Sequence, residues 1–362
     1  MLRVTFTIVL LVHGLIHLLG FLKAFKFAEL EQLSKEISKQ VGMLWLTTSI
    51  LFLIAFLLMI LHKDIWWLAG ISAIIISQVT IILSWNDAKY GSLPNLIILI
   101  VVAIAYGVWN FNQYALVEQQ NILADVDKNY SKLELTDLEN LPLPVKNWVI
   151  KSGAVGKIRA LSVRLEQSTK MRLEPDQVDW YDGEAVQYFT VDKPAFIWTV
   201  NMDINPFVFV KGRDYFKDGR GRMLIKLYSL FNVVDVANEK IDQGTMQRYL
   251  GEIVWFPSAV MSPYIKWESI DSLSAKAKMT YNGTSVEADF YFDESGEFKK
   301  FIALRYMGND KNAKKYPWII TSNKSEFLNG IKIPVDMDAT WQLPEGDFNW
   351  LKLKITRMDY NI

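Results

Sequence analysis

Histidine and cysteine, the side chains most often used for nucleophilic and metal chemistry, are nearly absent from this chain. Its 362 residues contain no cysteine and three histidines, His13, His17 and His62, all within the first 115 residues. Ser-His-Asp triads, Cys-His dyads and ordinary zinc sites each require one of these side chains. The rest of the chain must therefore act through binding or through carboxylate chemistry, and we expect no metal and no cofactor.

Two aspartates are candidates for carboxylate chemistry. Asp214 and Asp218 lie in an expected hairpin from Arg213 to Met223, with Arg213, Arg220 and Arg222 beside them. A pair of carboxylates is the arrangement that glycoside hydrolases use. The dipeptide Asp218-Gly219 is also a common tight-turn sequence. We favour the turn and predict no catalytic residue.

A second candidate group surrounds residues 248–255. Arg248 and Glu252 are spaced one helical turn apart, next to Tyr249 and Trp255. If their helix packs under a sheet, the pair could bind a polar headgroup or anchor the helix to the sheet; if it faces solvent, it is an ordinary surface pair. With Trp198, from a strand expected at the centre of the sheet, these residues form our hypothetical ligand-binding site.

A third candidate is a polar pair in an apolar segment. His13 and His17 are spaced i, i+4, so they lie on one face of the first apolar helix, near the middle of a membrane. Ionisable groups at this depth are functional candidates. The alternative is a pair of neutral imidazoles hydrogen-bonded to neighbouring helices.

The elements that would position these residues fall into two classes. Apolar runs at 4–22, 43–61, 65–85 and 94–114 are each close to the ~20 residues that span a bilayer. They predict four transmembrane helices within a domain at 1–115. Lysines are more frequent in the first and third loops than on the opposite side, which favours a cytoplasmic location for those loops. We therefore expect a multi-pass protein of the cytoplasmic (inner) membrane, in contact with its lipids, with a periplasmic or extracellular soluble domain.

Residues 116–141 are polar and acidic and predict a linker. From 142 to 362 the pattern changes to alternating apolar and polar residues separated by turn signals, which predicts about 11 antiparallel strands. One helix interrupts them, with Asp242 as its expected cap and Pro257 as its stop. A single sheet of this length should curl. We predict an α+β chain, in which the four helices precede an open half-barrel with a helix packed against its concave face.

Two resemblances bear on this domain. The order of elements across about 142–362 resembles the LolA, LolB and RseB group of bacterial envelope proteins, in which a curved, unclosed barrel holds helices over an apolar cavity. The segments Trp180 to Met202, Gly212 to Met223 and Arg248-Tyr-Leu-Gly-Glu-Ile-Val-Trp-Phe-Pro257 resemble an uncharacterised bacterial membrane-anchored family without an established activity. The first resemblance implies an apolar cavity, and the second implies no catalytic residues.

We therefore predict a membrane-anchored protein whose extracytoplasmic β-domain binds an apolar or lipid-like ligand, and we favour a role without catalysis. Two alternatives stay open: a structural or sensory envelope protein that binds a protein partner, and a carboxylate-dependent enzyme acting on glycans. Basic and acidic residues are balanced at 39 each, which argues against a nucleic-acid-binding surface.

Overall fold

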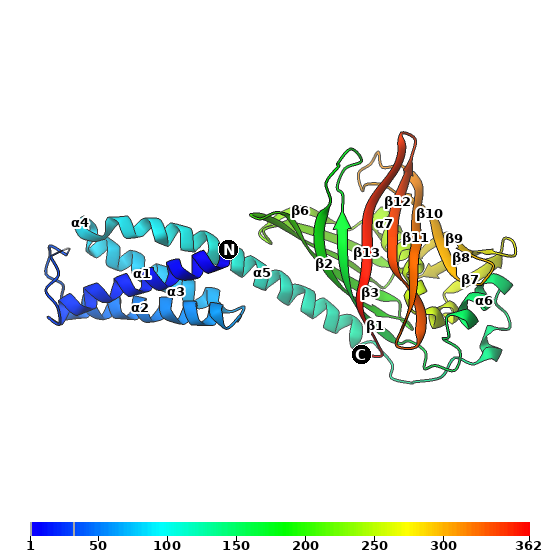
Figure 1. Cartoon of the computed structure of the whole chain (residues 1–362), viewed down its shortest axis with the longest axis horizontal. Helices are drawn as coiled ribbons and strands as arrows, with labels where there is room; N and C mark the ends of the chain where they lie inside the picture. The colour runs from blue at the N-terminus through cyan, green and yellow to red at the C-terminus, as the bar shows by residue number, and fades with distance from the viewer. Residues whose placement is uncertain (1, 32) are drawn as a thin grey trace. The chain divides into compact units, whose positions relative to one another are not determined.

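The chain forms two compact units, Met1–Gln113 and Tyr114–Ile362, which we call the helical unit and the β unit. This computed structural model describes residues 2–31 and 33–362, and Figure 1 shows the whole chain. Each unit has its own core, so each is described separately.

The helical unit contains the four apolar segments that the sequence predicts. Its helices are α1 (Leu2–Ala24), α2 (Lys39–Ile60), α3 (Trp66–Leu83), the short α4 (Trp85–Ala88) and α5 (Ser92–Leu123), with a 3-10 turn at Lys89–Gly91. Four segments are long and apolar enough to cross a membrane: Arg3–Ala24, Lys39–Ile60, Trp66–Leu83 and Trp85–Leu123. Helices α1 and α2 approach closely at Gly20, where a Cβ would lie only 2.1 Å from the Trp45 ring. Glycine leaves room for this ring, and small residues are common where transmembrane helices pack.

The segment expected to be a solvated linker is part of the β unit. Helix α5 continues to Leu123, where Ile122 is fully buried against Ala195 and Ile197. Leu133 and Leu138 are also fully buried and join the main core. The apolar side chains scattered through this acidic segment bind it to the sheet, which average composition did not indicate.

The β unit is built on one 13-stranded antiparallel sheet, two strands more than the approximate number expected. The strands are β1 (Ser162–Met171), β2 (Tyr181–Thr190), β3 (Ala195–Asn205), β4 (Val208–Lys217), β5 (Arg220–Leu227), β6 (Phe231–Val236), β7 (Ile265–Ser269), β8 (Ser274–Tyr281), β9 (Thr284–Phe292), β10 (Phe298–Tyr306), β11 (Lys315–Leu328), β12 (Ile331–Leu343) and β13 (Gly346–Tyr360). The helices are α6 (Leu143–Lys151) and α7 (Glu239–Glu252), followed by 3-10 turns at Ile253–Trp255 and Pro257–Met261.

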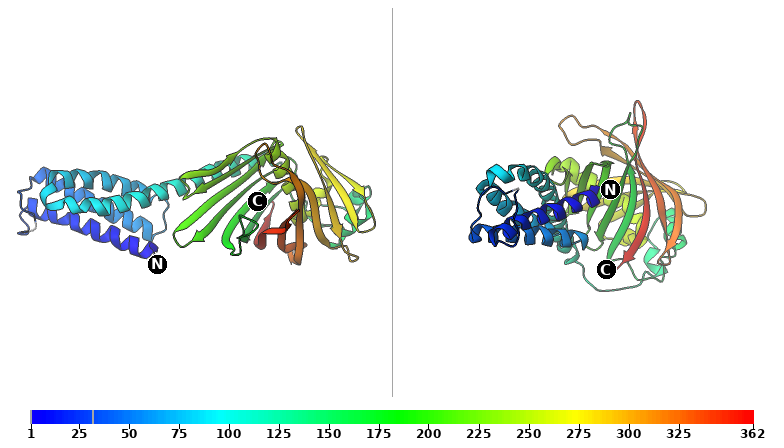
Figure 2. Two further views of the ribbon diagram at one scale, coloured as in Figure 1. Left: turned by 90° about the horizontal axis from the view of Figure 1, so that it is seen from above. Right: turned by 60° about the vertical axis from the view of Figure 1, so that its left-hand side comes forward.

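The strand order is β6-β5-β4-β3-β2-β1-β13-β12-β11-β10-β9-β8-β7. Two meanders therefore meet where β1 pairs with β13, and the sheet ends in β6 on one side and β7 on the other. The sheet curls without closing, as Figure 2 shows. The predicted fold class, an open half-barrel following four apolar helices, is confirmed.

Helix α7 lies within the curl and contacts strands from both meanders: β4 and β5 on one side, β9 and β10 on the other. A Cβ on Gly221 of β5 would lie 2.3 Å from the Thr245 hydroxyl, so this glycine permits the close approach of helix and strand. The helix begins earlier than expected, because the Asn238 side chain caps it by accepting from two backbone N–H groups. Asp242, the expected cap, instead accepts from the Gly221 N–H at 2.7 Å.

Candidate functional site

The space between α7 and the concave face of the sheet contains a cavity of about 300 Å³ and an adjoining pocket of about 50 Å³. The two share Trp198, Asp214, Arg248, Arg305, Trp350 and Leu351 in their walls. Most of the larger cavity is walled by apolar side chains from six strands: Met171, Val200, Met202, Val210, Met223, Ile225, Trp341, Trp350 and Leu351. A cavity of this size is at the lower end of the range for small-molecule sites.

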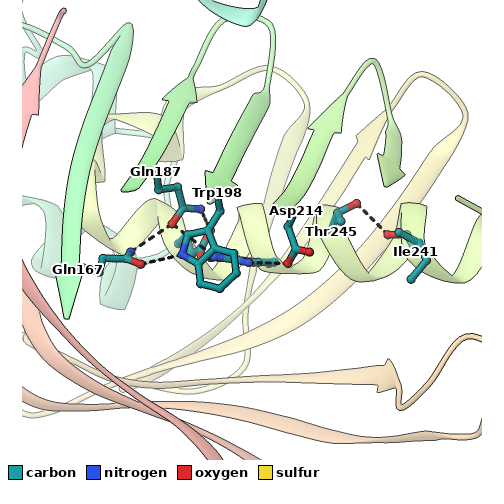
Figure 3. Close-up of polar contacts among 8 residues, drawn as sticks. Gln167, Gln187, Trp198, Asp214, Ile241 and Thr245 are labelled. Atoms are coloured by element: carbon teal, nitrogen blue, oxygen red, sulfur yellow. Dashed lines mark hydrogen bonds and ion pairs between the residues drawn. The ribbon is translucent and has the colours of Figure 1, made fainter. Parts of the chain in front are cut away.

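A chain of polar contacts lies beside the smaller pocket (Figure 3). The Trp198 indole N–H donates to the Gln167 carbonyl oxygen at 2.9 Å, and the Gln167 amide donates to Gln187 at 3.2 Å. The Gln187 amide in turn donates to the Glu252 carboxylate at 2.8 Å. These bonds satisfy polar groups that strands β1, β2 and β3 would otherwise bury without partners.

Arg248 is the centre of this network. Its Nε donates to Glu252 at 2.8 Å and its Nη1 to Asp214 at 2.7 Å. Its guanidinium carbon lies 4.6 Å from the centre of the Trp198 ring, which fits a cation–π contact. One cation thus bridges a carboxylate on its own helix and another on β4.

Burial decides the acid–base properties of this network. Burial raises the pKa of the Glu252 carboxyl, while the Arg248 guanidinium and the Gln187 amide limit that rise. Burial disfavours the charge on Arg248, but Glu252 and Asp214 outweigh it and the pKa of Arg248 is raised. The arginine therefore stays charged and bonds both carboxyl groups, and its charge opposes the rise in the pKa of Glu252.

A second cation, Arg305 of β10, lies in the walls of both the cavity and the pocket. Its guanidinium carbon is 4.3 Å from the centre of the Trp318 ring and 5.9 Å from that of Trp341. A Cβ on Gly244 of α7 would lie 3.2 Å from its Nε, so the guanidinium also packs against the helix backbone. Arg305 is therefore held between the sheet and the helix.

The structure brings four of the five predicted ligand-site residues together. Trp198, Arg248, Glu252 and Trp255 all line the smaller pocket. On α7 and the turn that follows it, the last three are spaced i, i+4 and i+7, and such residues share one helix face.

Tyr249 does not line either space. Its side chain is fully buried in the core and does not reach the cavity, and its hydroxyl donates to the Thr190 carbonyl at 2.9 Å. The same hydroxyl lies 3.1 Å from the Tyr264 hydroxyl, and burial raises its pKa well above the ordinary value. Because it is one residue after Arg248, it points about 100° away around the helix.

The two aspartates proposed for carboxylate chemistry occupy different surroundings. Asp218 and Gly219 have φ of 52° and 76°, so both adopt the left-handed conformation of a tight hairpin turn between β4 and β5. Asp214 lines the cavity and bonds Arg248. The turn prediction for Asp218 is confirmed, and the carboxylates that line the smaller pocket with Asp214 are Glu252 and Asp338.

The sequence interpretation missed Gln167 and Arg305. The signal for Arg305 was present in the strand pattern, since Phe301 and Ala303 are buried at the preceding alternate positions of β10. A charged residue continuing an inward-facing apolar row marks a charge inside the curl.

In the helical unit, His13 and His17 are buried and hydrogen-bonded to neighbouring helices. His13 Nε2 lies 2.9 Å from Asn95 Oδ1 on α5, and His17 Nε2 lies 2.8 Å from the Ser77 hydroxyl on α3. The Ser77 hydroxyl also donates to Asn95 at 3.0 Å. This is the packing alternative stated for the pair. Within residues 2–31 and 33–362, no three His, Cys, Asp or Glu side chains are placed to hold a metal ion.

Comparisons with known proteins give a family and several distant structural neighbours. One neighbour is a LolA superfamily protein from Nitrosomonas europaea, with 11% identity, 60% of this chain and 94% of the other covered, and a TM-score of 0.33. The second is a beta-barrel-like protein of a domain of unknown function, DUF1849, from Brucella abortus, with 9% identity, 56% and 100% covered, and a TM-score of 0.27.

No curated protein matches the chain. Residues 131–353 match the model of a family of unknown function, DUF6544. This match covers more than half of the chain and nearly all of the sheet. The chain therefore belongs to the DUF6544 family, whose function is unknown.

Proposed function

We propose that this chain is a membrane-anchored protein whose β unit binds a lipid-like ligand in the cavity under α7. The observation that carries the proposal is the cavity of about 300 Å³ in the concave face of the sheet. Protein interiors are normally packed without voids much larger than a water molecule. A space of this size beside a well-packed helix is therefore a feature that needs a ligand or solvent to fill it.

The side chains around the cavity favour an apolar ligand. Three methionines contribute to its walls: Met171 and Met202 are buried, and Met223 is half-buried. Methionine is unbranched and flexible and adapts to chains of varied shape. With Trp341 and Trp350 from the opposite meander, these side chains make a surface that an alkyl chain can contact on both sides.

The four apolar helices support membrane anchoring. Many of their large apolar side chains are exposed in the described part of the helical unit, as suits a surface covered by lipid. An anchor would keep the binding domain near a supply of lipid-like molecules. We further propose that the membrane is the cytoplasmic membrane and that the β unit lies on its extracytoplasmic side. The reason is that the lysine-rich first and third loops should face the cytoplasm.

The network beside the smaller pocket favours binding over catalysis. A glycosidase acid must carry a proton while its partner carboxylate is ionised. Here Asp214 and Glu252 both accept hydrogen bonds from the Arg248 guanidinium, so both carboxyl groups are held by one fixed cation of the protein. The arrangement fits a fixed polar end for a ligand site.

Photolabelling of the full chain tests the proposal. The protein is reconstituted in lipid nanodiscs and exposed to a dodecanol that carries a photoreactive diazirine on its chain. Labelled peptides are then mapped by mass spectrometry. We expect labels on β1, β3 and β5 at the cavity wall in addition to labels on the apolar helices.

Two variants of β5 make the test specific. Met223→Trp fills the cavity and should remove the labels from its walls. Lys226→Trp adds the same ring on the opposite face of the strand and should leave them, because alternate side chains point to opposite faces. Labels confined to the apolar helices, or labels on the sheet that Met223→Trp leaves unchanged, would refute the proposed cavity.

A further inference from the structure

The charges around the larger cavity are unequal. Lys240, Arg248 and Arg305 contribute cationic side chains to its walls, and Asp214 contributes the acidic one. Arg213 also lies in the wall, but its guanidinium pairs with Glu118 at 3.2 Å. Even with Arg213 left out, the wall carries more positive than negative charge.

Arg248 and Arg305 differ in what they contact. Arg248 bonds both Asp214 and Glu252. For Arg305, no residue among 2–31 and 33–362 places an acceptor within hydrogen-bonding distance of the guanidinium. This group packs on the rings of Trp318 and Trp341 and against α7 at Gly244. The polar network therefore satisfies one arginine of the cavity and leaves the donors of the other available.

The position of Arg305 restricts what its guanidinium can reach. It packs on the Trp318 ring at 4.3 Å and against the α7 backbone at Gly244. Burial lowers its pKa to about 10, which still leaves it charged at neutral pH. A guanidinium held in place in this way presents several N–H donors in a fixed fork that matches a carboxylate or phosphate.

We propose that the ligand is an anionic amphiphile whose carboxylate or phosphate head binds Arg305 while its apolar chain lies along the methionine and tryptophan side chains of the cavity. This inference rests on the proposed function and adds the charge of the ligand to it. Lys240, whose ammonium donates to the Asp310 carbonyl, adds a second positive charge to the same wall.

The experiment compares two photoreactive probes of equal chain length, a dodecanoate and a dodecanol, on the full chain in zwitterionic nanodiscs. Labelling is quantified on peptides of the cavity wall alone. We expect the dodecanoate to label them at least about tenfold more efficiently than the dodecanol, since hydrogen bonds to charged groups contribute about that factor or more.

Arg305→Gln should reduce cavity labelling by the dodecanoate about tenfold and leave labelling by the dodecanol within about twofold. Lys300→Gln is the matched control: it removes one positive charge from the same strand, where Lys300 is exposed and lies over the Tyr291 ring. It should change neither probe. If Arg305→Gln fails to fold, the comparison of the two probes on the unmodified chain decides the question by itself.

Three outcomes overturn the inference in distinguishable ways. Equal cavity labelling by both probes refutes the anionic head but leaves the proposed lipid-like ligand intact. If neither the dodecanoate nor the dodecanol labels the cavity wall, both proposals are refuted. Complete displacement of the dodecanoate by millimolar inorganic phosphate would show that the site takes a free anion and not an amphiphile; retention of the probe in phosphate supports the amphiphile.

Discussion

Replacing Arg248 by methionine tests whether the network under α7 is a buried ionic cluster. The side chains of Arg248, Asp214 and Glu252 are 12%, 17% and 8% exposed. Methionine keeps the apolar stem of the arginine but leaves both carboxylates without their cation. Removing one partner of a buried ion pair costs about 3–5 kcal/mol, and we expect the β unit to lose stability in this range.

A surface pair supplies the matched control. Arg222 pairs with Asp235 at 2.8 Å, but these side chains are 43% and 32% exposed. Solvent screens such pairs, and their contribution is typically about 0–1 kcal/mol. Arg222→Met should therefore have a much smaller effect than Arg248→Met.

The effect of Arg248→Met should depend on pH. Burial raises the pKa of Glu252, so this carboxyl binds a proton more tightly in the folded than in the unfolded chain. Its favourable contribution is present at low pH and is lost as the pH rises through the raised pKa. Without Arg248 this pKa rises further, so the stability deficit of Arg248→Met should shrink as the pH falls from neutral into the acid range.

Urea-dependent pulse proteolysis of the full chain in nanodiscs measures these changes. The double variant Arg248→Met/Glu252→Gln removes one of the two uncompensated charges, so it should recover about 1–3 kcal/mol relative to Arg248→Met at neutral pH. A loss of less than about 1 kcal/mol for Arg248→Met, or a deficit that grows as the pH falls, would refute the buried cluster.

Three further substitutions test the packing around the candidate sites. Gly221→Ala should destabilise the β unit by about 1–3 kcal/mol, because the new Cβ would collide with α7; an unchanged urea midpoint would contradict the close packing of this helix on β5. Tyr249→Phe should cost about 1–3 kcal/mol in the same assay by leaving the Thr190 carbonyl without its donor, and it should leave cavity photolabelling unchanged; reduced labelling would show that Tyr249 belongs to the ligand site after all. Asn95→Leu should destabilise the helical unit by about 0.6–2 kcal/mol by removing the acceptor of His13, as measured by unfolding in sodium dodecyl sulfate; a gain in stability would contradict the hydrogen-bond network.

Several features of this protein were predictable from local sequence. The four apolar helices follow from the length and hydropathy of continuous segments, and strands follow from alternation along the chain. The turn at Asp218-Gly219 follows from residues that tolerate positive φ. The shared face of Arg248, Glu252 and Trp255 follows from helical spacing alone. In each case, the controlling geometry acts between residues that are near neighbours in the chain.

Other features depended on contacts between distant segments. Whether Asn238 or Asp242 caps α7 was decided by the approach of β5, because the Gly221 N–H takes the Asp242 carboxylate as its acceptor. The acidic segment before the sheet is held by the burial of Ile122 and Leu133, which only a surface from another part of the chain could provide. The average composition of the segment therefore could not predict this burial.

The candidate site depends both on local sequence and on contacts between distant segments. The sequence alone determined that the β unit has no histidine or cysteine chemistry, and it determined the spacing of the polar residues on α7. The tertiary structure decided that β4 and β10, from opposite meanders, face the same helix, so that Asp214 and Arg305 line one cavity. The physical reason is that the curl of a 13-stranded sheet arises from packing summed over all strands, and no local pattern specifies which distant strands it brings together.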